Sequence, residues 1–472
     1  MIRTLLRGAF LASSIVFALD GCGSSSPSLP TTGQMPFARP KVGGSIAHVI
    51  VMIQENRSFN DLFATFPGAI GTTTGKMLVL QSGKYVQRSV NLTKSNLEAT
   101  TNLSHLYSSF LTSYDKGAMD GFSLVKHAGN GQYEGKQPYQ YVDPSQIGAY
   151  WSIASQWGLA EKMFQTQGSD SFSAHQDLIR GGTFINSTES LIDTPSSPFV
   201  WGCDARPSAR TSLITTSLEF LSNQGPFPCS NKFPDYGSNG YQTLRDLLDA
   251  KQLSWKYYAP QFQKGQPNGL WNAFDLIAPV RYGKEWKANI SSPETNVLSD
   301  IQNGDLPAMS WVIPDAQNSD HPAYSKKDTG PAWVASVVNA VGQSKYWDST
   351  VVIVVWDDWG GFYDEVPPPS IDDQGGIGFR VPMLVVSPYV KAGNGSKGGY
   401  LSRTVYQFGS IVRFIEDVWG LGRLGTTDTT CKSMGDMFDF TQKPRKFTKI
   451  PAQYSRSFFL HQKRSGLPVD TE

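Results

Sequence analysis

The sequence has almost no excess of charge of either sign. Its 472 residues include 41 lysines and arginines against 40 aspartates and glutamates. Proteins that bind the phosphate backbone of nucleic acids present a basic surface, which a nearly neutral chain does not offer. Charge therefore argues against nucleic acid as a partner. The sequence also contains no internal repeat.

Long apolar runs are absent as well, apart from a short one near the N-terminus. Residues 11–19 are apolar except for Ser13 and Ser14, and Arg3 and Arg7 precede them. A run of this length is too short to span a membrane comfortably. A basic start followed by a short apolar stretch is typical of a signal peptide that directs export.

The end of this stretch predicts a lipid anchor. The letters LDGC at 19–22 and the serines that follow resemble a bacterial lipoprotein signal, with Cys22 as the lipidated residue and residues 23–42 as a flexible tether. Asp20 is unusual in such a motif, so cleavage elsewhere followed by plain secretion is the alternative. Both interpretations predict an exported protein, either a periplasmic or outer-membrane lipoprotein or a secreted one.

Cysteine is scarce, with four in the chain. Export makes disulfides possible. Cys203 and Cys229 flank a stretch rich in proline, serine and asparagine, so we expect them to form a disulfide. Cys431 would then be a buried free thiol.

Two buried strands are expected to end in metal-type ligands. Residues 48–54 and 351–355 are short β-branched runs, which is typical of strands buried on both faces of a parallel sheet. Ligand sites in open α/β sheets lie at the carboxyl ends of the strands. The first run leads into Glu55 and Asn56, and the second into Asp357 and Asp358. Three carboxylates and an amide oxygen at one sheet edge would repel one another without a cation between them. The simpler alternative to a metal site is that these are ordinary ends of strands, where acidic residues are common.

Alternating strand and helix patterns predict an α/β fold with a mainly parallel sheet. We expect further strands at 255–258, 309–313 and 381–386, and helices at 143–166, 243–248, 333–341 and 405–419. Residues 70–100 read as a hairpin or a long loop. We expect one catalytic domain over residues 43–445, with an insertion of little regular structure at 185–240 and a tail at 446–472. Two domains remain an alternative for a chain of this length.

A serine at a predicted helix start is a candidate nucleophile. Residues 168–179 read as a loop that enters a helix, where free N–H groups favour a bound phosphate. Ser171 and His175 are four apart and would share a face of that helix, so His175 is a further candidate catalytic residue. The alternative is a serine that only caps the helix. Ser169 and Ser173 are rival candidates.

Histidines beside polar residues are candidates for proton transfer. Asp320 and His321 follow the predicted strand at 309–313, and such a pair suits either two further metal ligands or an oriented general acid. His105 lies in another polar segment, ahead of a glycine-punctuated loop at 114–122 that could line a pocket.

Six short motifs, taken together, resemble a known family. They are ENRSFN at 55–60, DKGAMDGF at 115–122, SFSAHQ at 171–176, SDHP at 319–322, WDDWGGFYD at 356–364 and GFRVP at 378–382. In this order they resemble the motifs of the bacterial phosphoesterase family that contains the non-haemolytic phospholipases C and the AcpA-type acid phosphatases. The resemblance covers about residues 45–440.

The resemblance implies an α/β/α sandwich of the alkaline phosphatase type, with a metal held by Glu55, Asn56, Asp357 and Asp358. Ser171 matches the family's nucleophile. The sequence departs from the family at two positions, with Asn60 in place of Asp and Glu365 where relatives usually carry His. The second departure puts in doubt any contact of that position with the leaving group.

The implied histidines are His105 and His321, which match residues that contact the phosphoryl group or act as acid. We therefore expect a phosphoseryl intermediate on Ser171, formed with a divalent cation. Oxygen-rich ligands favour Ca, Mg or Mn, and the nearby histidines leave Zn or Fe open.

The expected substrate is a phosphate monoester or a phospholipid. Two other classes remain open. One is a surface lipoprotein that binds a sugar or a lipid headgroup on a scaffold that has lost catalysis. The other is a sulfatase or phosphotransferase, although the sequence has no Cys-x-Pro-x-Arg element of sulfatases.

Overall fold

The computed structural model describes most of the chain after the expected tether. The described residues are 45–98, 102–127, 130–196, 201–229, 240–263, 266–267, 269, 271–322, 329–369, 377–393 and 398–467. The expected signal peptide, Cys22 and the tether lie outside them. No helix in these segments is long and apolar enough to cross a membrane.

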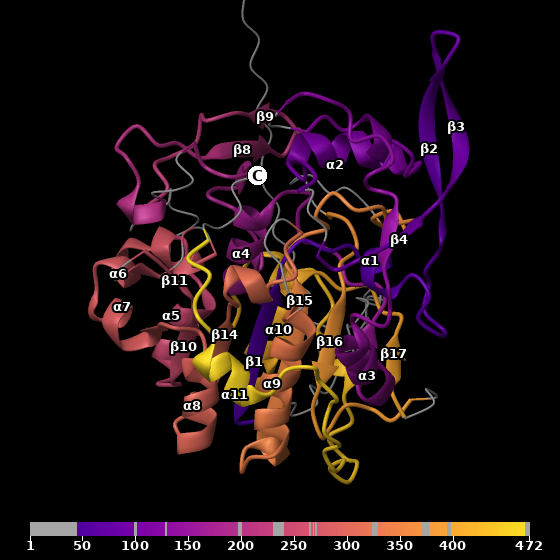
Figure 1. The fold of residues 1–472 in the computed structure, drawn as a ribbon. Helices are drawn as coiled ribbons and strands as arrows, with labels where there is room; N and C mark the ends of the chain where they lie inside the picture. The colour runs from indigo at the N-terminus through magenta and orange to yellow at the C-terminus, as the bar shows by residue number, and fades with distance from the viewer. Residues whose placement is uncertain are drawn as a thin grey trace, which may run out of the picture. The chain divides into compact units, whose positions relative to one another are not determined.

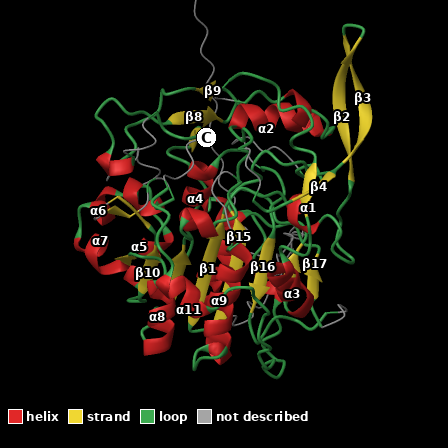
Figure 2. Ribbon diagram, viewed as in Figure 1, coloured by secondary structure: helices red, strands yellow, loops and turns green. Residues whose placement is uncertain are grey.

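A large mixed sheet forms the centre of the described residues (Figures 1 and 2). Its eight strands run in the order β13 (Ile290–Ser291), β10 (Trp255–Tyr258), β14 (Met309–Val312), β1 (His48–Gln54), β15 (Thr350–Trp356), β16 (Met383–Val386), β6 (Gly158–Ala160) and β17 (Tyr400–Ser402). Pairings are parallel except for those of β16, which is antiparallel to β15 and β6. The prediction of a mainly parallel α/β sheet is confirmed.

The two apolar runs singled out in the sequence pair directly with each other. β1 and β15 are in register from His48 opposite Thr350 to Gln54 opposite Trp356. Every residue of β15 is buried, and so is every residue of β1 except His48. Burial on both faces explains why these strands are continuous apolar runs without alternation. Their ends therefore lie side by side, although they are about three hundred positions apart in the chain.

Helices cover both faces of the sheet. Side chains alternate along a strand, so Gln54 and Val51 point to opposite faces. Gln54 Nε2 donates to the Tyr150 hydroxyl on one face, whereas Trp311, paired with Val51, donates from Nε1 to the Leu178 carbonyl on the other. Tyr150 belongs to helix α3 (Gly148–Gln156) and Leu178 to helix α4 (Ser171–Arg180). The fold is therefore a three-layer α/β/α sandwich.

Each helical layer contains further helices. On the α3 side, α9 (Gly330–Gly342) packs against α3, α8 (Asn296–Asn303) and α11 (Arg456–His461). On the α4 side, α4 packs against α5 (Leu244–Ala250) and α10 (Phe408–Trp419). The other α-helices of the described residues are α1 (Phe59–Phe63), α2 (Tyr107–Tyr114), α6 (Ala278–Arg281) and α7 (Lys284–Asn289).

The helix expected over 143–166 is shorter than its pattern predicts. Helix α3 ends at Gln156, because Trp157 takes a non-helical conformation, and β6 follows at once. Residues of β6 pair with β16 on one side and β17 on the other. Pairing with strands more than two hundred residues away decides this segment, and a local pattern does not contain that information.

The expected insertion contains more regular structure than its composition predicts. Strands β7 (Glu189–Ile192), β8 (Ser212–Thr215) and β9 (Phe220–Leu221) form a small antiparallel sheet there. Cys203 and Cys229 form a disulfide in this region, and Cys431 is a buried free thiol. The remaining small sheets pair β2 (Thr74–Gln81) with β3 (Lys84–Asn91), β4 (Thr93–Ser95) with β5 (Gln140–Val142), and β11 (Gln261–Gln263) with β12 (Gln266–Pro267).

The described part of the expected tail, residues 446–467, packs onto the α3 side of the fold. Ile450 exchanges backbone hydrogen bonds with the Asn339 side chain, and Phe459 lies edge-on against Trp333. Both Ile450 and Phe459 are buried. Ile450 and Phe459 thus join this segment to the core.

Candidate active site

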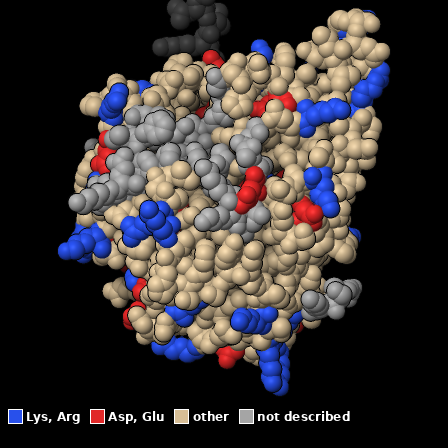
Figure 3. All heavy atoms as spheres, in the orientation of Figure 1, with Lys and Arg blue, Asp and Glu red and all other residues tan. Residues whose placement is uncertain are grey.

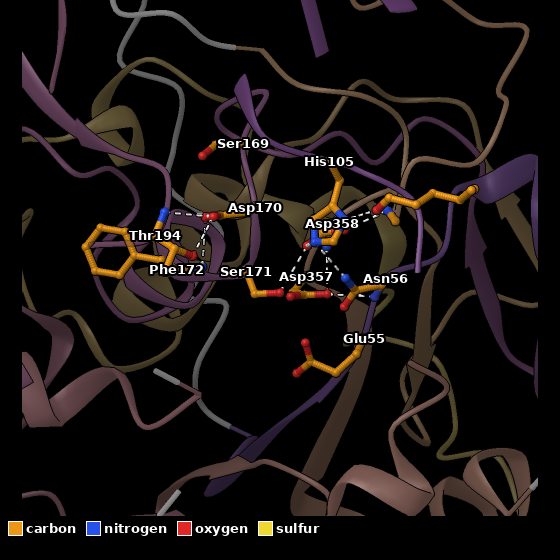
Figure 4. A network of polar contacts seen from close by, with 12 residues as sticks. Glu55, Asn56, His105, Ser169, Asp170, Ser171, Phe172, Thr194, Asp357 and Asp358 are labelled. Atoms are coloured by element: carbon orange, nitrogen blue, oxygen red, sulfur yellow. Dashed lines mark hydrogen bonds and ion pairs between the residues drawn. The ribbon is translucent and has the colours of Figure 1, made fainter. Parts of the chain in front are cut away.

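The exits of β1 and β15 turn two carboxylates toward helix α4. Gln54 and Trp356 are register partners on the α3 face, where the Trp356 ring lies 4.9 Å from that of Tyr150. The next residue on each strand, Glu55 and Asp357, points the other way because side chains alternate. In Figure 4 the Asp357 carboxylate lies beside Ser171, and the Glu55 carboxylate lies below both.

Glu55 and Asp357 meet His175, which projects from helix α4. His175 Nε2 lies 3.1 Å from Glu55 Oε1 and 3.8 Å from Asp357 Oδ2. One ligand atom from each residue lies within 4.8 Å of the other two, and all three side chains are buried. Burial lowers the pKa of His175 to about 4, against the opposing effect of Asp357. The imidazole is therefore neutral near pH 7, which is the form that binds metal ions.

The surroundings of Asp357 fit a bound cation. Its Oδ1 accepts backbone N–H groups from Asn56 at 2.9 Å and from Asp358 at 2.8 Å. Its Oδ2 is buried and has no hydrogen-bond partner among the described residues. A buried carboxylate oxygen without a partner is costly, and a divalent ion would offset that cost. The donor set of two carboxylates and one imidazole suits several divalent metals.

Asp358 connects this cluster to Ser171. Ser171 Oγ donates to Asp358 Oδ2 at 3.1 Å, and Asp358 Oδ1 accepts the Gly360 N–H at 2.6 Å. A side chain at Gly360 would meet the Asn56 carbonyl oxygen at 2.1 Å, and Gly360 has a φ of 61°. Glycine is therefore required for the close approach of the two strand exits.

The structure separates the three candidate serines. Ser171 is the first residue of α4, and its N-cap Asp170 accepts the Phe172 N–H. Ser169 donates instead to Asp193 Oδ1 at 2.9 Å, and Ser173 shares a hydrogen bond with Ser169. Of the three, Ser171 is the one in contact with Asp358.

A residue that the sequence analysis did not identify supports this helix start. Asp170 Oδ2 accepts both the backbone N–H and the hydroxyl of Thr194, at 2.7 and 2.6 Å (Figure 4). Thr194 follows β7, so the insertion holds the residue that positions Ser171. No local motif marks Thr194, because its role depends on a contact with a residue 24 positions away.

His105 faces the same cluster from a different segment. Its Nδ1 lies 2.7 Å from the Leu103 carbonyl oxygen, which can only accept, so Nδ1 carries a hydrogen. Its Nε2 lies 3.0 Å from Asn56 Nδ2 and 3.8 Å from Asp358 Oδ2. The Leu103 carbonyl therefore orients the ring so that Nε2 faces Asn56 and Asp358.

Asp320 contacts the α3 side of the strand ends. Its Oδ2 accepts the Tyr150 hydroxyl at 2.7 Å and Trp356 Nε1 at 3.2 Å, and its carbonyl accepts Arg57 Nε at 2.9 Å. Burial raises the pKa of Asp320 to about 6. Asp320 therefore holds the ends of β1 and β15 in position from the α3 face of the sheet. Glu55 lies on the other face.

The next residue, His321, is also buried. Its backbone N–H donates to the Ser319 hydroxyl at 3.2 Å, and its ring lies 6.2 Å from that of Trp271. The described contacts do not bring the His321 ring to Ser171, so its catalytic role stays a prediction.

The two departures from the family's motifs belong to one buried ion cluster around Arg380. Arg380 pairs with Asp364, and both are fully buried. Asp364 also accepts the Asn60 N–H at 3.0 Å, and the Asn60 amide bonds the Thr72 carbonyl and N–H. An aspartate at position 60 would lack the donor for the Thr72 carbonyl. Asn60 therefore has a structural explanation.

Glu365 also belongs to this cluster. Its carboxylate lies 3.4 Å from Arg380 Nη2. Burial, with Asp364 next to it, raises the pKa of Glu365 to about 7. Its described ion pair is thus with Arg380.

The sequence of this chain is similar to those of known phosphoesterases. The sequence matches the model of the phosphoesterase family over residues 46–422. The non-hemolytic phospholipase C of Pseudomonas aeruginosa is 22% identical over 427 residues, covering 80% of this chain and 54% of that protein. Phospholipase C B of Mycobacterium tuberculosis is 23% identical over 453 residues, covering 84% of this chain and 78% of that protein. The chain spans only 54% and 59% of the two Pseudomonas aeruginosa relatives that it matches.

A solved structure is also similar to this chain. A protein in the alkaline phosphatase superfamily from Vibrio parahaemolyticus is 10% identical, with a TM-score of 0.36, and the match covers 81% of this chain and 70% of that one. The family match extends over most of the described fold and includes the six motifs seen in the sequence. This chain therefore belongs to the phosphoesterase family.

Proposed function

We propose that this chain is an exported hydrolase of phosphoric esters that requires a divalent cation and uses Ser171 as its nucleophile. One observation carries the proposal. Ser171 Oγ lies 3.1 Å from Asp358, whose neighbour Asp357 belongs to the buried cluster with Glu55 and His175. A hydroxyl, a helix start and a set of metal-type ligands thus meet at one point.

The metal would be held by Glu55, His175 and Asp357, with Asn56 and Asp358 next to them. When bound, a divalent cation there would lower the pKa of the serine hydroxyl and neutralise phosphoryl oxygens. The fit rests on Asp357 Oδ2, which is buried and has no hydrogen-bond partner among the described residues.

Ser171 is placed to attack phosphorus. As the Oγ–P bond forms and the bond to the leaving oxygen breaks, the serine proton can pass to Asp358, with which it already shares a hydrogen bond. The first N–H groups of α4 favour the negative phosphoryl oxygens at the same position. Water then hydrolyses the phosphoseryl ester, which restores Ser171 and releases phosphate or a phosphate monoester.

His105 is the proposed proton donor to the leaving oxygen. Leu103 holds the ring through Nδ1, so a proton to be transferred would sit on Nε2. Nε2 lies 3.0 Å from the Asn56 amide nitrogen and would exchange that contact for the leaving oxygen of the substrate. Asp358 Oδ2 lies 3.8 Å from His105 Nε2. His321 is a second proposed acid, supported by its place in the SDHP motif.

Phospholipid-type diesters are the proposed substrates, because several relatives are named phospholipases C. Phosphate monoesters are the alternative substrates on the same site. Export and lipidation at Cys22 are part of the proposal and rest on the N-terminal sequence.

The test is release of nitrophenol from nitrophenyl phosphorylcholine and from nitrophenyl phosphate by the purified chain. We expect turnover that is lost on chelation and restored by a divalent metal. Ser171→Ala should lower turnover by at least about a thousandfold. Ser173→Ala is the matched control, because this serine lies on the same helix and bonds Ser169.

The two esters separate the substrate classes. Preference for the choline ester would support a phospholipase C, and preference for the monoester would support a phosphatase. Near-normal turnover by Ser171→Ala, or no turnover of either ester with any metal, would refute the proposal.

A further inference from the structure

A long two-stranded hairpin stands away from the rest of the described fold (Figures 1 and 2). It consists of β2 and β3, paired from Thr74 opposite Asn91 to Gln81 opposite Lys84. Ser82 and Gly83 form its tip, with φ values of 49° and 77°, as a tight hairpin turn with two left-handed residues requires. Its outer half therefore has few neighbours from the rest of the molecule.

The base of the hairpin is held in place. Leu78 N–H donates to the Asp120 carbonyl at 3.0 Å, and the Tyr139 hydroxyl donates to the Lys76 carbonyl at 2.8 Å. Met77 is buried in a small aromatic cluster that includes Phe122. The base of the hairpin is thus fixed to the body of the fold, from which its outer half projects.

The tip exposes apolar side chains on one face. Leu80 and Tyr85 are direct cross-strand partners, so they lie on the same face, and they are 65% and 51% exposed. The Tyr133 side chain lies next to that of Tyr85 and is 55% exposed. Large apolar groups that gather on a projection indicate a contact surface more strongly than scattered ones do. We call Leu80, Tyr85 and Tyr133 the tip patch.

The hairpin is basic. Residues 74–91 include Lys76, Lys84 and Arg88 and no acidic residue. Lys126 Nζ adds a further positive charge 5.6 Å from the centre of the Tyr133 ring. Figure 3 shows basic side chains along the projecting hairpin. The tip patch therefore combines two tyrosine rings and a leucine with nearby basic side chains.

The hairpin extends toward the catalytic side of the sheet. Figure 1 shows it rising past the body of the fold in the direction in which β1 and β15 run, toward their carboxyl ends. Ser171 and the metal-type ligands lie at those ends. A surface that met the tip patch would thus lie on the same side as the proposed active site.

We propose that the hairpin docks the protein onto a phospholipid surface that carries negative charge, with Leu80, Tyr85 and Tyr133 inserted at the headgroup level. This inference rests on the proposed function, which it deepens by assigning aggregated phospholipid as the substrate form. Tyrosine favours the interface between water and lipid, and lysines attract anionic headgroups while their stems lie along apolar surface. The absence of acidic residues in the hairpin complements a negatively charged surface.

Sedimentation with lipid vesicles tests the proposal. The protein is the full chain carrying Cys22→Ser, so that an N-terminal lipid cannot contribute. The vesicles are phosphatidylcholine alone and phosphatidylcholine mixed with phosphatidylglycerol. The docking variant is Leu80→Thr with Tyr85→Thr, because threonine keeps the strand preference. Leu460→Thr on α11 is the matched control, since Leu460 is also exposed, at 39%.

We expect the parent chain to bind the mixed vesicles more tightly than the neutral ones. The double variant should bind at least about tenfold more weakly, because two apolar side chains no longer enter the lipid. Lys84→Gln should lower binding to the mixed vesicles alone, by roughly fivefold. Leu460→Thr should bind like the parent.

Hydrolysis of nitrophenyl phosphorylcholine in solution separates this proposal from the proposed function. The double variant should turn over this soluble ester as the parent does. Vesicle binding that does not depend on Leu80 and Tyr85, or no binding by the parent, would overturn the docking proposal. Light scattering measures whether the double substitution changes the molar mass of the protein. A changed molar mass together with unchanged vesicle binding would assign the tip patch to contact with a second protein copy, which would also overturn the docking proposal. Loss of soluble turnover in the parent would refute the proposed function alone, because sedimentation does not depend on catalysis.

Discussion

Ser171 Oγ donates a hydrogen bond to Asp358 Oδ2 at 3.1 Å, across 187 positions of sequence. Ser171 begins helix α4, and Asp358 follows strand β15. The bond joins the nucleophile proposed from one motif to the metal-type ligands of another. It also separates Ser171 from Ser169 and Ser173, whose hydroxyls bond each other.

Asp358→Asn should lower kcat by at least about a hundredfold, because an amide cannot take the Ser171 proton. We expect a smaller change in KM, since the carboxylate acts mainly as the bond to phosphorus forms. Steady-state kinetics with nitrophenyl phosphorylcholine measures both constants. The control is the exposed Asp348→Asn, which should behave like the parent. Equal kcat values for Asp358→Asn and the parent would contradict this role.

His175→Ala and Glu55→Gln should each reduce the metal content of the dialysed protein. Each substitution removes one of the three ligand atoms that lie within 4.8 Å of one another. Elemental analysis of the purified chain measures the metal directly, without reference to activity. His461→Ala is the control, because that histidine is exposed on α11. Unchanged metal content in both ligand variants would place the ion elsewhere.

Arg380→Met should destabilise the fold by about 3 kcal/mol, because it leaves the buried carboxylate of Asp364 without its charged partner. Arg380 also donates to the Ile70 and Glu161 carbonyls, so those acceptors lose a partner as well. Denaturant unfolding followed by circular dichroism measures the change. Arg206→Met is the control, since Arg206 is exposed and no ion pair of it is seen among the described residues. A loss no larger than that of the control would show that Asp364 finds another way to be neutralised.

Glu294 should make stability depend on pH. Burial raises the pKa of Glu294 from its ordinary 4.5 to about 8, and the negative charge of Asp315 acts in the same direction. Between these values the folded chain keeps a proton that the unfolded chain has released. The contribution of Glu294 to the free energy of unfolding is therefore fully present below about pH 4.5 and is lost as pH rises to about 8. The fall is at most about 1.4 kcal/mol per pH unit.

Glu294→Gln tests this dependence, since glutamine does not titrate. Unfolding free energies of the parent and the variant are measured at several pH values from about 4.5 to about 8. The difference between the two proteins should change in favour of the variant as pH rises. A difference that stays constant across this range would contradict the raised pKa.

Patterns within short segments predicted much of the fold. The β-branched runs at 48–54 and 351–355 form neighbouring strands of the sheet, because burial on both faces selects such residues wherever they lie. The helix expected over 143–166 was wrong in its second half. Residues 158–160 pair instead with β16 and β17, which lie more than two hundred positions away, and a local pattern does not contain that information.

Sequence motifs also identified most of the candidate site residues, but they did not predict all of the contacts that these residues make. Glu55 and Asp357 were expected to converge, and they do. His175 was expected beside Ser171 as a catalytic residue, and the structure places its ring against the carboxylates of Glu55 and Asp357. Asp320 was expected at the reacting centre, and its side chain bonds Tyr150 and Trp356 on the other face of the sheet.

The sequence alone determined the candidate residues of the site, because motif letters, helix starts and strand ends are local properties of the chain. It determined the parallel α/β class for the same reason. Tertiary structure decided which side of the sheet each side chain faces and which distant residue it meets. Those contacts depend on the strand order β14, β1, β15 and on where α4 packs against it. Neither is a local property, since both follow from burying apolar surface across the whole fold.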